Sequence, residues 1–94
     1  MPAYWIAHVT VTDPEQYKGY QALAPQAFAK FGGKFLARGG ASETHEGAKF
    51  DRHVLIEFPD LAAARACYVS PEYQAAKAQR ESAAEVMITI FDGL

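Results

Sequence analysis

The chain has 94 residues, of which 50% are hydrophobic and 21% charged, and its formal net charge is −2. This length is enough for one domain, residues 1–94, with a single core, and the composition is globular rather than disordered. The weak negative charge argues against nucleic acid as a partner, because such binding depends on neutralising phosphates. The single cysteine, Cys67, excludes an internal disulfide framework.

The first half of the chain predicts a strand, a helix and a second strand. Residues 3–11 alternate between apolar and polar types, as a half-buried strand does. Thr12-Asp13-Pro14 then offers a capping side chain followed by proline at the first helical position. Apolar residues recur at helical spacing up to Gly32-Gly33, and Pro25 within this run predicts a kinked or split helix. Residues 34–38 are expected to form a short strand.

The second half repeats the order of strand, helix and strand. The polar segment 41–50 is interpreted as a long, mobile hairpin connection. Residues 52–58 alternate clearly and predict a strand, and Pro59-Asp60 begins a second helix, in which Cys67 is expected to be a core residue. Ser70-Pro71-Glu72 restarts this helix with a new cap, and residues 85–91 predict the last strand.

The order β-α-β-β-α-β predicts a ferredoxin-like α+β sandwich. Right-handed crossovers in both β-α-β units give an antiparallel sheet with strand order 4-1-3-2 and both helices on one face. Because side chains alternate along a strand, the two faces of this sheet can be read from the sequence. The face expected under the helices is apolar: Trp5, Ala7, Val9, Val11, Phe35, Ala37, Val54, Ile56, Phe58, Val86, Ile88 and Ile90.

The opposite face mixes apolar and ionisable residues. Its members are Tyr4, Ile6, His8, Thr10, Lys34, Leu36, Arg38, His53, Leu55, Glu57, Glu85, Met87, Thr89 and Phe91. An apolar patch of this size is a liability for a monomer, and two such sheets packed face to face would cover it. The sequence therefore predicts a homodimer through this face.

The same face supplies the candidate site. If Ile6 lies opposite Leu55, then His8 falls near His53, and the hairpin is expected to bring Arg38 beside them. In one interpretation Arg38 holds a carboxylate or carbonyl oxygen, and His8 or His53 moves a proton as a catalytic residue. In the other, these groups make polar contacts across the dimer or lie at its wet rim.

A second row on this face contains Tyr4, Glu57 and Lys34. Tyr4 and Glu57 are candidate substrate-binding residues, and Glu57 is interpreted either as a base or as a partner for a neighbouring cation or Tyr4. His53 and Glu57 lie four strand residues apart, roughly 13 Å, and cannot chelate one metal ion. No third ligand for His8 and His53 is evident, so neither a metal site nor a bound cofactor is expected.

Other notable side chains are interpreted as structural. The aromatic residues of the first helix, Tyr17, Tyr20, Phe28 and Phe31, have the spacing of a core face. Tyr68 and Tyr73 either line a cleft mouth or pack in the core, with packing favoured. Arg80 is expected to tie the end of the second helix to a carboxylate of the last strand.

Several stretches together resemble the domain of unknown function 1330 family. They are residues 12–14, 32–40, 52–60 and 68–74 together with Arg80, and the likeness covers nearly the whole chain. The resemblance implies the dimeric α+β-barrel superfamily, which includes small monooxygenases, lactone isomerases, haem-degrading and haem-containing enzymes, and stress-related proteins. It brings no catalytic residues with it, and fold alone is a weak guide to chemistry.

Two functions therefore remain open at this level. The first is a small-molecule enzyme that performs proton transfer, isomerisation or cofactor-independent oxygenation on a carbonyl or carboxylate compound, in a pocket between the sheet and the partner subunit. The second is a non-catalytic ligand-binding or structural dimer. The N-terminus has no basic leader and no segment has the length of a membrane span, so a cytoplasmic protein is expected.

Overall fold

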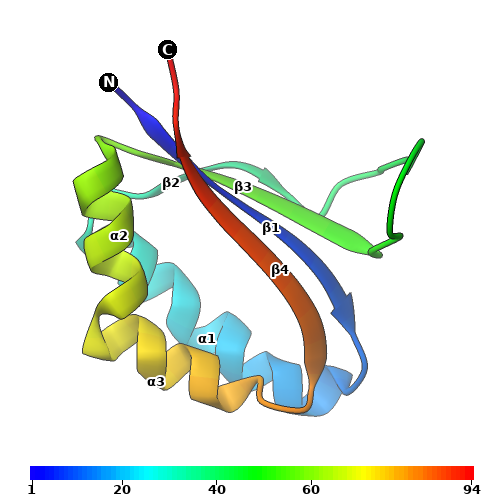
Figure 1. The fold of residues 1–94 in the computed structure, drawn as a ribbon. Coiled ribbons are helices and arrows are strands. Elements are labelled where there is room, and N and C mark those ends of the chain that lie inside the picture. Colours follow the sequence, from blue (N-terminus) through cyan, green and yellow to red (C-terminus); the bar gives the residue numbers. More distant parts are fainter.

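The computed structural model describes all 94 residues as one antiparallel sheet with helices on one face (Figure 1). The elements are β1 (Ala3–Val11), α1 (Pro14–Lys30), β2 (Lys34–Arg38), β3 (Arg52–Phe58), α2 (Leu61–Val69), α3 (Pro71–Gln79) and β4 (Ala84–Asp92). The sheet order is β2-β3-β1-β4, which confirms the predicted ferredoxin-like topology. None of the helices has both the length and the apolarity needed to cross a bilayer.

Helix α1 begins as its sequence predicts and passes through its internal proline. The Asp13 side chain accepts a hydrogen bond from the Gln16 N–H at 3.2 Å, and Pro14 occupies the first turn. The sequence predicted that Pro25 would kink or split the helix. The helix continues through Pro25, so the prediction of a split is wrong. Ala24, Ala27 and Phe28 around it are all buried. Their packing against the core holds the helix together where proline removes one backbone hydrogen bond.

Ser70 separates α2 from α3, as predicted. It is 5% exposed, and its N–H donates to the carbonyl oxygen of Cys67 at 3.1 Å. Its Oγ accepts from the N–H of Tyr73 at 3.1 Å and donates to the same Cys67 carbonyl at 2.6 Å. One side chain thus caps the end of one helix and the start of the next, and turns the chain between them.

The core is an aromatic cluster between β1, β3 and the helices. Trp5 is fully buried, with ring centroids of Phe28 at 5.0 Å and Tyr73 at 4.9 Å in edge-on arrangements, and Phe58 stacked at 6.0 Å. Helix α1 lies alongside α3 (Figure 1). The aromatic side chains therefore fill the layer between sheet and helices around Trp5.

The reactivity of the Cys67 thiol provides a test of how well this core is buried. It is fully buried, and burial raises the pKa of its thiol to about 11. At pH 8 only roughly one thiol in a thousand is then ionised, and the thiolate is the reactive form. We expect the native protein to resist a thiol reagent such as DTNB, with labelling appearing only in denaturant. The variant Ala66→Cys places a thiol on the exposed neighbouring position and should label at once; fast labelling of Cys67 itself would contradict this packing.

Candidate functional site

A bulge in β2 moves Arg38 to the face under the helices. Phe35 pairs with Ile56, but Ala37 pairs with Leu55 and Arg38 with Val54, so one extra residue interrupts the alternation. An extra residue reverses the face of every side chain after it. The Arg38 guanidinium carbon accordingly lies 4.3 Å from the ring centroid of Phe35. The prediction that Arg38 shares a face with His8 and His53 is wrong.

Arg38 instead lines a cavity between the sheet and helices α1 and α3. The cavity is narrow, with a volume of about 40 Å³, and it is partly open to solvent. Its walls are mostly apolar and aromatic, with Trp5 and Phe28 among them. The polar groups that reach it are Tyr17, Tyr20, Gln21, Arg38, Arg52 and Arg80.

The three arginines of this cavity have no acidic partner. The ion pairs of the molecule, Lys18–Glu15 and Lys30–Glu72, both lie on the surface. The Nε atoms of Arg52 and Arg80 are buried and have no hydrogen-bond partner. A guanidinium withdrawn from water without a counter-charge is unfavourable, so the cavity is suited to an anion.

Arg80 is held by two tyrosines. Its Nη2 donates to the hydroxyl of Tyr73 at 3.4 Å. The Tyr73 hydroxyl in turn lies 2.9 Å from the Tyr20 hydroxyl. The guanidinium carbon of Arg80 lies 5.2 Å from the centroid of the Tyr20 ring. Burial raises the pKa of Tyr20 far above its usual value, so this phenol stays protonated and can donate. Burial alone would lower the pKa of Arg80, but the contacts with Tyr73 and Tyr20 leave it raised.

Arg52 and Arg80 both exert an electrostatic effect on Tyr17. Burial raises its pKa, while Arg52 and Arg80 both oppose that rise by favouring the ionised phenol. An anion near Tyr17 would therefore be attracted by both guanidinium groups. None of the residues that line the cavity is aspartate, glutamate or histidine. The cavity can hold an anion and donate hydrogen bonds to it, but no aspartate, glutamate or histidine is present to act as a base.

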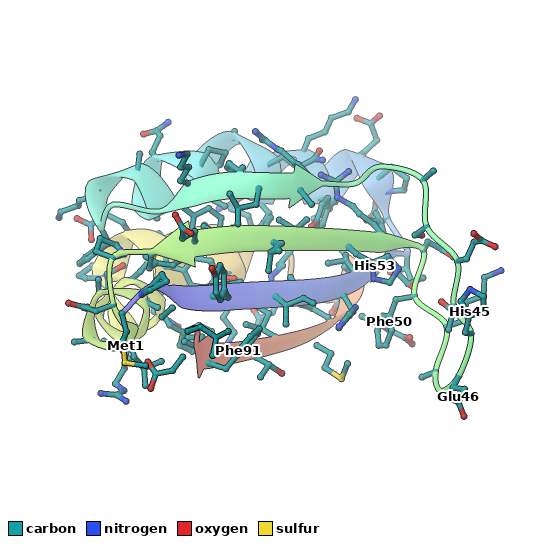
Figure 2. The ribbon with its side chains drawn as sticks, turned by 90° about the horizontal axis from the view of Figure 1, so that it is seen from above. Met1, His45, Glu46, Phe50, His53 and Phe91 are labelled. Carbon is teal, nitrogen blue, oxygen red and sulfur yellow. The ribbon has the colours of Figure 1, made fainter.

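The predicted histidine pair lies on the opposite face of the sheet. His8 pairs with His53 in the register expected from the sequence, and their Nδ1 atoms are 2.8 Å apart. Only one of these atoms can carry the hydrogen, so one ring donates to the other. Figure 2, which looks onto this face, places His53 and Phe50 at the end of the sheet nearest the connection that carries His45. The pair lines a shallow hollow under this connection, separate from the arginine cavity.

The second predicted row is also formed on this face. Glu57 pairs in register with Tyr4 on one side and Lys34 on the other. The Tyr4 hydroxyl donates to Glu57 Oε2 at 3.5 Å, whereas Lys34 forms no ion pair with it. No group of three potential metal ligands occurs anywhere in the chain. The predicted site residues thus form two separate pairs on the open face, with Arg38 on the other side of the sheet.

Arg52 and Arg80 were not identified as site residues from the sequence. For Arg52 the sequence does contain a signal. Arg52 has the same parity as Val54, Ile56 and Phe58, so it continues the apolar face of β3 with a charge. A Cβ at Gly39 would lie 2.6 Å from Arg52 Nη1, which the flexible end of the arginine could relieve, so it is the φ of +73° that favours glycine there. Arg80 was expected to reach a carboxylate of β4, but it turns inward to Tyr73 and Tyr20.

Comparison with known proteins gives a family and a fold. The model of the family described as "Domain of unknown function (DUF1330)" matches residues 2–94, and the chain belongs to that family. Comparison with curated proteins finds no match.

Several solved structures share the fold. RPA0582 of Rhodopseudomonas palustris, of unknown function, is 20% identical with a TM-score of 0.80, covering 99% of this chain and 82% of its own. A dimeric ferredoxin-like protein of unknown function from Jannaschia sp. CCS1 is 11% identical with a TM-score of 0.74, covering 99% and 100%. SnoaB of Streptomyces nogalater, a cofactor-independent oxygenase, is 16% identical with a TM-score of 0.65, covering 99% and 93%. At these identities the likeness concerns the fold alone.

The uncompensated charge in the cavity has a consequence for stability. Replacing Arg52 with methionine removes a half-buried cation that has no counter-ion and keeps most of its apolar stem. We expect Arg52→Met to raise the free energy of unfolding by about 1 kcal/mol in the absence of ligand, measured by urea denaturation. The control Arg65→Met, on the exposed face of α2, should change it by less than about 0.5 kcal/mol. A clear loss of stability in Arg52→Met would mean that the guanidinium is satisfied in solution.

Proposed function

We propose that this member of the DUF1330 family binds a small acidic or enolisable carbonyl compound between its sheet and its helices, and stabilises the anion of that compound. The observation that carries the proposal is the convergence of Arg38, Arg52 and Arg80, none with an acidic partner, on one largely apolar cavity. Arginine presents a fixed fork of donors that matches carboxylate and enolate oxygens. The apolar and aromatic walls favour a compound with an apolar body.

The proposed pocket differs in place from the one expected between the sheet and a partner subunit. The open face offers a hollow near His8 and His53, but the three unpaired cations lie on the other side of the sheet. Electrostatic stabilisation of a developing anion is commonly the largest contribution to catalysis, and it requires charges that are already oriented. Arg80, fixed by Tyr73 and Tyr20, meets that requirement.

The cavity is lined by no aspartate, glutamate or histidine, and this limits the reactions that it can support. A compound that arrives already ionised, or that ionises readily, needs no base from the protein. Arg52 and Arg80 would hold its oxyanion, and the protonated Tyr20 hydroxyl would donate to it. Of the reactions expected from the sequence, isomerisation or oxygenation of such an acidic compound fits better than proton abstraction by a side chain. In an oxygenation the substrate carbanion would form a C–O bond with dioxygen, and the resulting peroxide would take up the proton lost on ionisation. Loss of a second hydrogen from the same carbon would then break the O–O bond and leave a carbonyl group and water.

Two observations support a homodimer through the open face. Leu36, Met87 and Phe91 on this face are 47%, 48% and 41% exposed, which is unusual for large apolar side chains gathered on one sheet. Two proteins of the same fold, from Jannaschia sp. CCS1 and Bacteroides fragilis, are described as dimeric. In such a dimer His8 and His53 would lie at the seam. Their polar contact suits that position, and a catalytic role would require a substrate in the hollow beside them.

A non-catalytic ligand-binding dimer is the second candidate. The absence of aspartate, glutamate and histidine from the cavity favours it, since binding of an anion needs only the arginines and tyrosines. The two candidates share the same binding site and differ in turnover. Oxygen uptake and product formation with a panel of enolisable aromatic ketones and carboxylates would distinguish them.

Arg80 should dominate binding of anions. We expect Arg80→Met to weaken binding of an aromatic carboxylate such as 2-naphthoate at least tenfold, measured by calorimetry, because a charge-assisted hydrogen bond is worth about 1.5–3 kcal/mol. Arg80→Lys keeps the charge without the fork and should have an intermediate affinity. Arg65→Met, remote from the cavity, should bind as the parent does. Equal affinity in Arg80→Met would remove the basis for the proposed site.

The open face should control assembly. We expect Leu55→Asp to sediment as a monomer at micromolar concentration and to melt at a lower temperature, because a carboxylate would be buried in an apolar interface. Leu23→Asp introduces the same charge at an exposed leucine of α1 and should leave sedimentation unchanged. A parent protein that is itself monomeric, or a Leu55→Asp variant that remains dimeric, would refute the interface.

A further inference from the structure

A groove lies beside the arginine cavity, at the edge of the sheet. Six residues line this groove: Tyr68, Lys77, Arg80, Val86, Ile88 and Ile90. Arg80 and Val86 line the cavity as well, so these two side chains form a wall common to both spaces. The groove has a volume of about 470 Å³ and opens beside β4, which is an edge strand. In Figure 1, α3 leads through a short connection into β4.

One wall of the groove is an apolar strip. Val86, Ile88 and Ile90 are alternate residues of β4 and point to the same face, where each is half-buried. From Val86 to Ile90 the strip is roughly 13 Å long, at about 3.3 Å per residue. The alternation that places these side chains under the helices leaves them only partly covered, because β4 is the outermost strand on this side of the sheet.

The opposite wall carries a second cation without an acidic partner. Lys77 Nζ lies 3.3 Å from the Tyr68 hydroxyl and 5.5 Å from the centroid of that ring, and it takes part in no ion pair. Together with Arg80 it makes the groove positive beside the cavity. An apolar strip that leads to unpaired cations matches a ligand with an anionic head and an apolar chain.

We propose that the ligand of this protein is an amphipathic carboxylate. The proposal rests on the function proposed above and specifies its substrate class. The carboxylate head binds Arg80 and the hydroxyl of Tyr20, and an unbranched apolar chain lies along Val86, Ile88 and Ile90. A compact aromatic acid would occupy the inner cavity alone, whereas a chain-bearing acid would use both spaces.

Chain length provides the test. The dissociation constants of hexanoate, octanoate and decanoate are measured by calorimetry with the 94-residue chain, with benzoate as the compact acid. Affinity should rise with each methylene laid on the strip, by up to about fourfold per group. Octylamine, which has the same chain and the opposite charge, should not bind. Methyl NMR should show octanoate shifting Val86, Ile88 and Ile90.

Variants separate the groove from the cavity. Ile88→Glu places a like charge on the strip and should weaken octanoate and decanoate at least tenfold while leaving benzoate unchanged. Ile88→Ala, which preserves the fold more safely, should reduce the gain per methylene. Ala66→Glu adds the same charge on the exposed side of α2 and should have no effect.

The outcomes distinguish this inference from the function on which it rests. If benzoate binds and affinity is flat with chain length, the groove has no role and the cavity proposal stands. If no carboxylate binds, both proposals fail. Methyl shifts confined to Leu36, Leu55 and Met87 would place the chain on the open face and overturn the groove.

Discussion

The alternation of side chains along the strands is the constraint on which the molecule depends. Alternation places Trp5 and its neighbours on one side of the sheet and the ionisable residues of β1 and β3 on the other. The apolar side requires helices above it, and the capped helices α1, α2 and α3 supply them. A single bulge at Leu36 breaks the alternation and brings Arg38 under the helices. One extra residue in a five-residue strand thus moves an exposed charge to the other face of the sheet.

The interior shows a tension between stability and binding. The aromatic cluster around Trp5 packs tightly, yet Trp5 and Phe28 also line the cavity that the three arginines reach. A half-buried arginine without a counter-charge makes no contribution to folding that an apolar side chain could not make better. In the proposed function a bound anion supplies the missing charge. Natural proteins often retain such unfavourable groups where they bind or react.

The two faces of the sheet favour different kinds of contact. The side under the helices has unpaired cations, a narrow cavity and a groove along β4, which together favour a small anionic molecule. The open side has exposed apolar residues and polar pairs that already satisfy each other, His8 with His53 and Tyr4 with Glu57. Mutually satisfied polar groups within an apolar surface favour contact with a second copy of the chain. A dimer formed in this way leaves the groove beside β4 on the opposite side of each sheet.

The sequence by itself determined the elements, the strand order and most of the register, because periodicity, caps and crossover handedness are local or topological rules. It also placed His8 opposite His53 and Tyr4 opposite Glu57, since pairing one residue of an antiparallel ladder sets the others. Only the tertiary structure decided the face of Arg38, because a bulge depends on how β2 fits against β3. It alone brought Arg80 to Tyr20 and Tyr73, since the space between α3 and the sheet is set by the packing of whole elements.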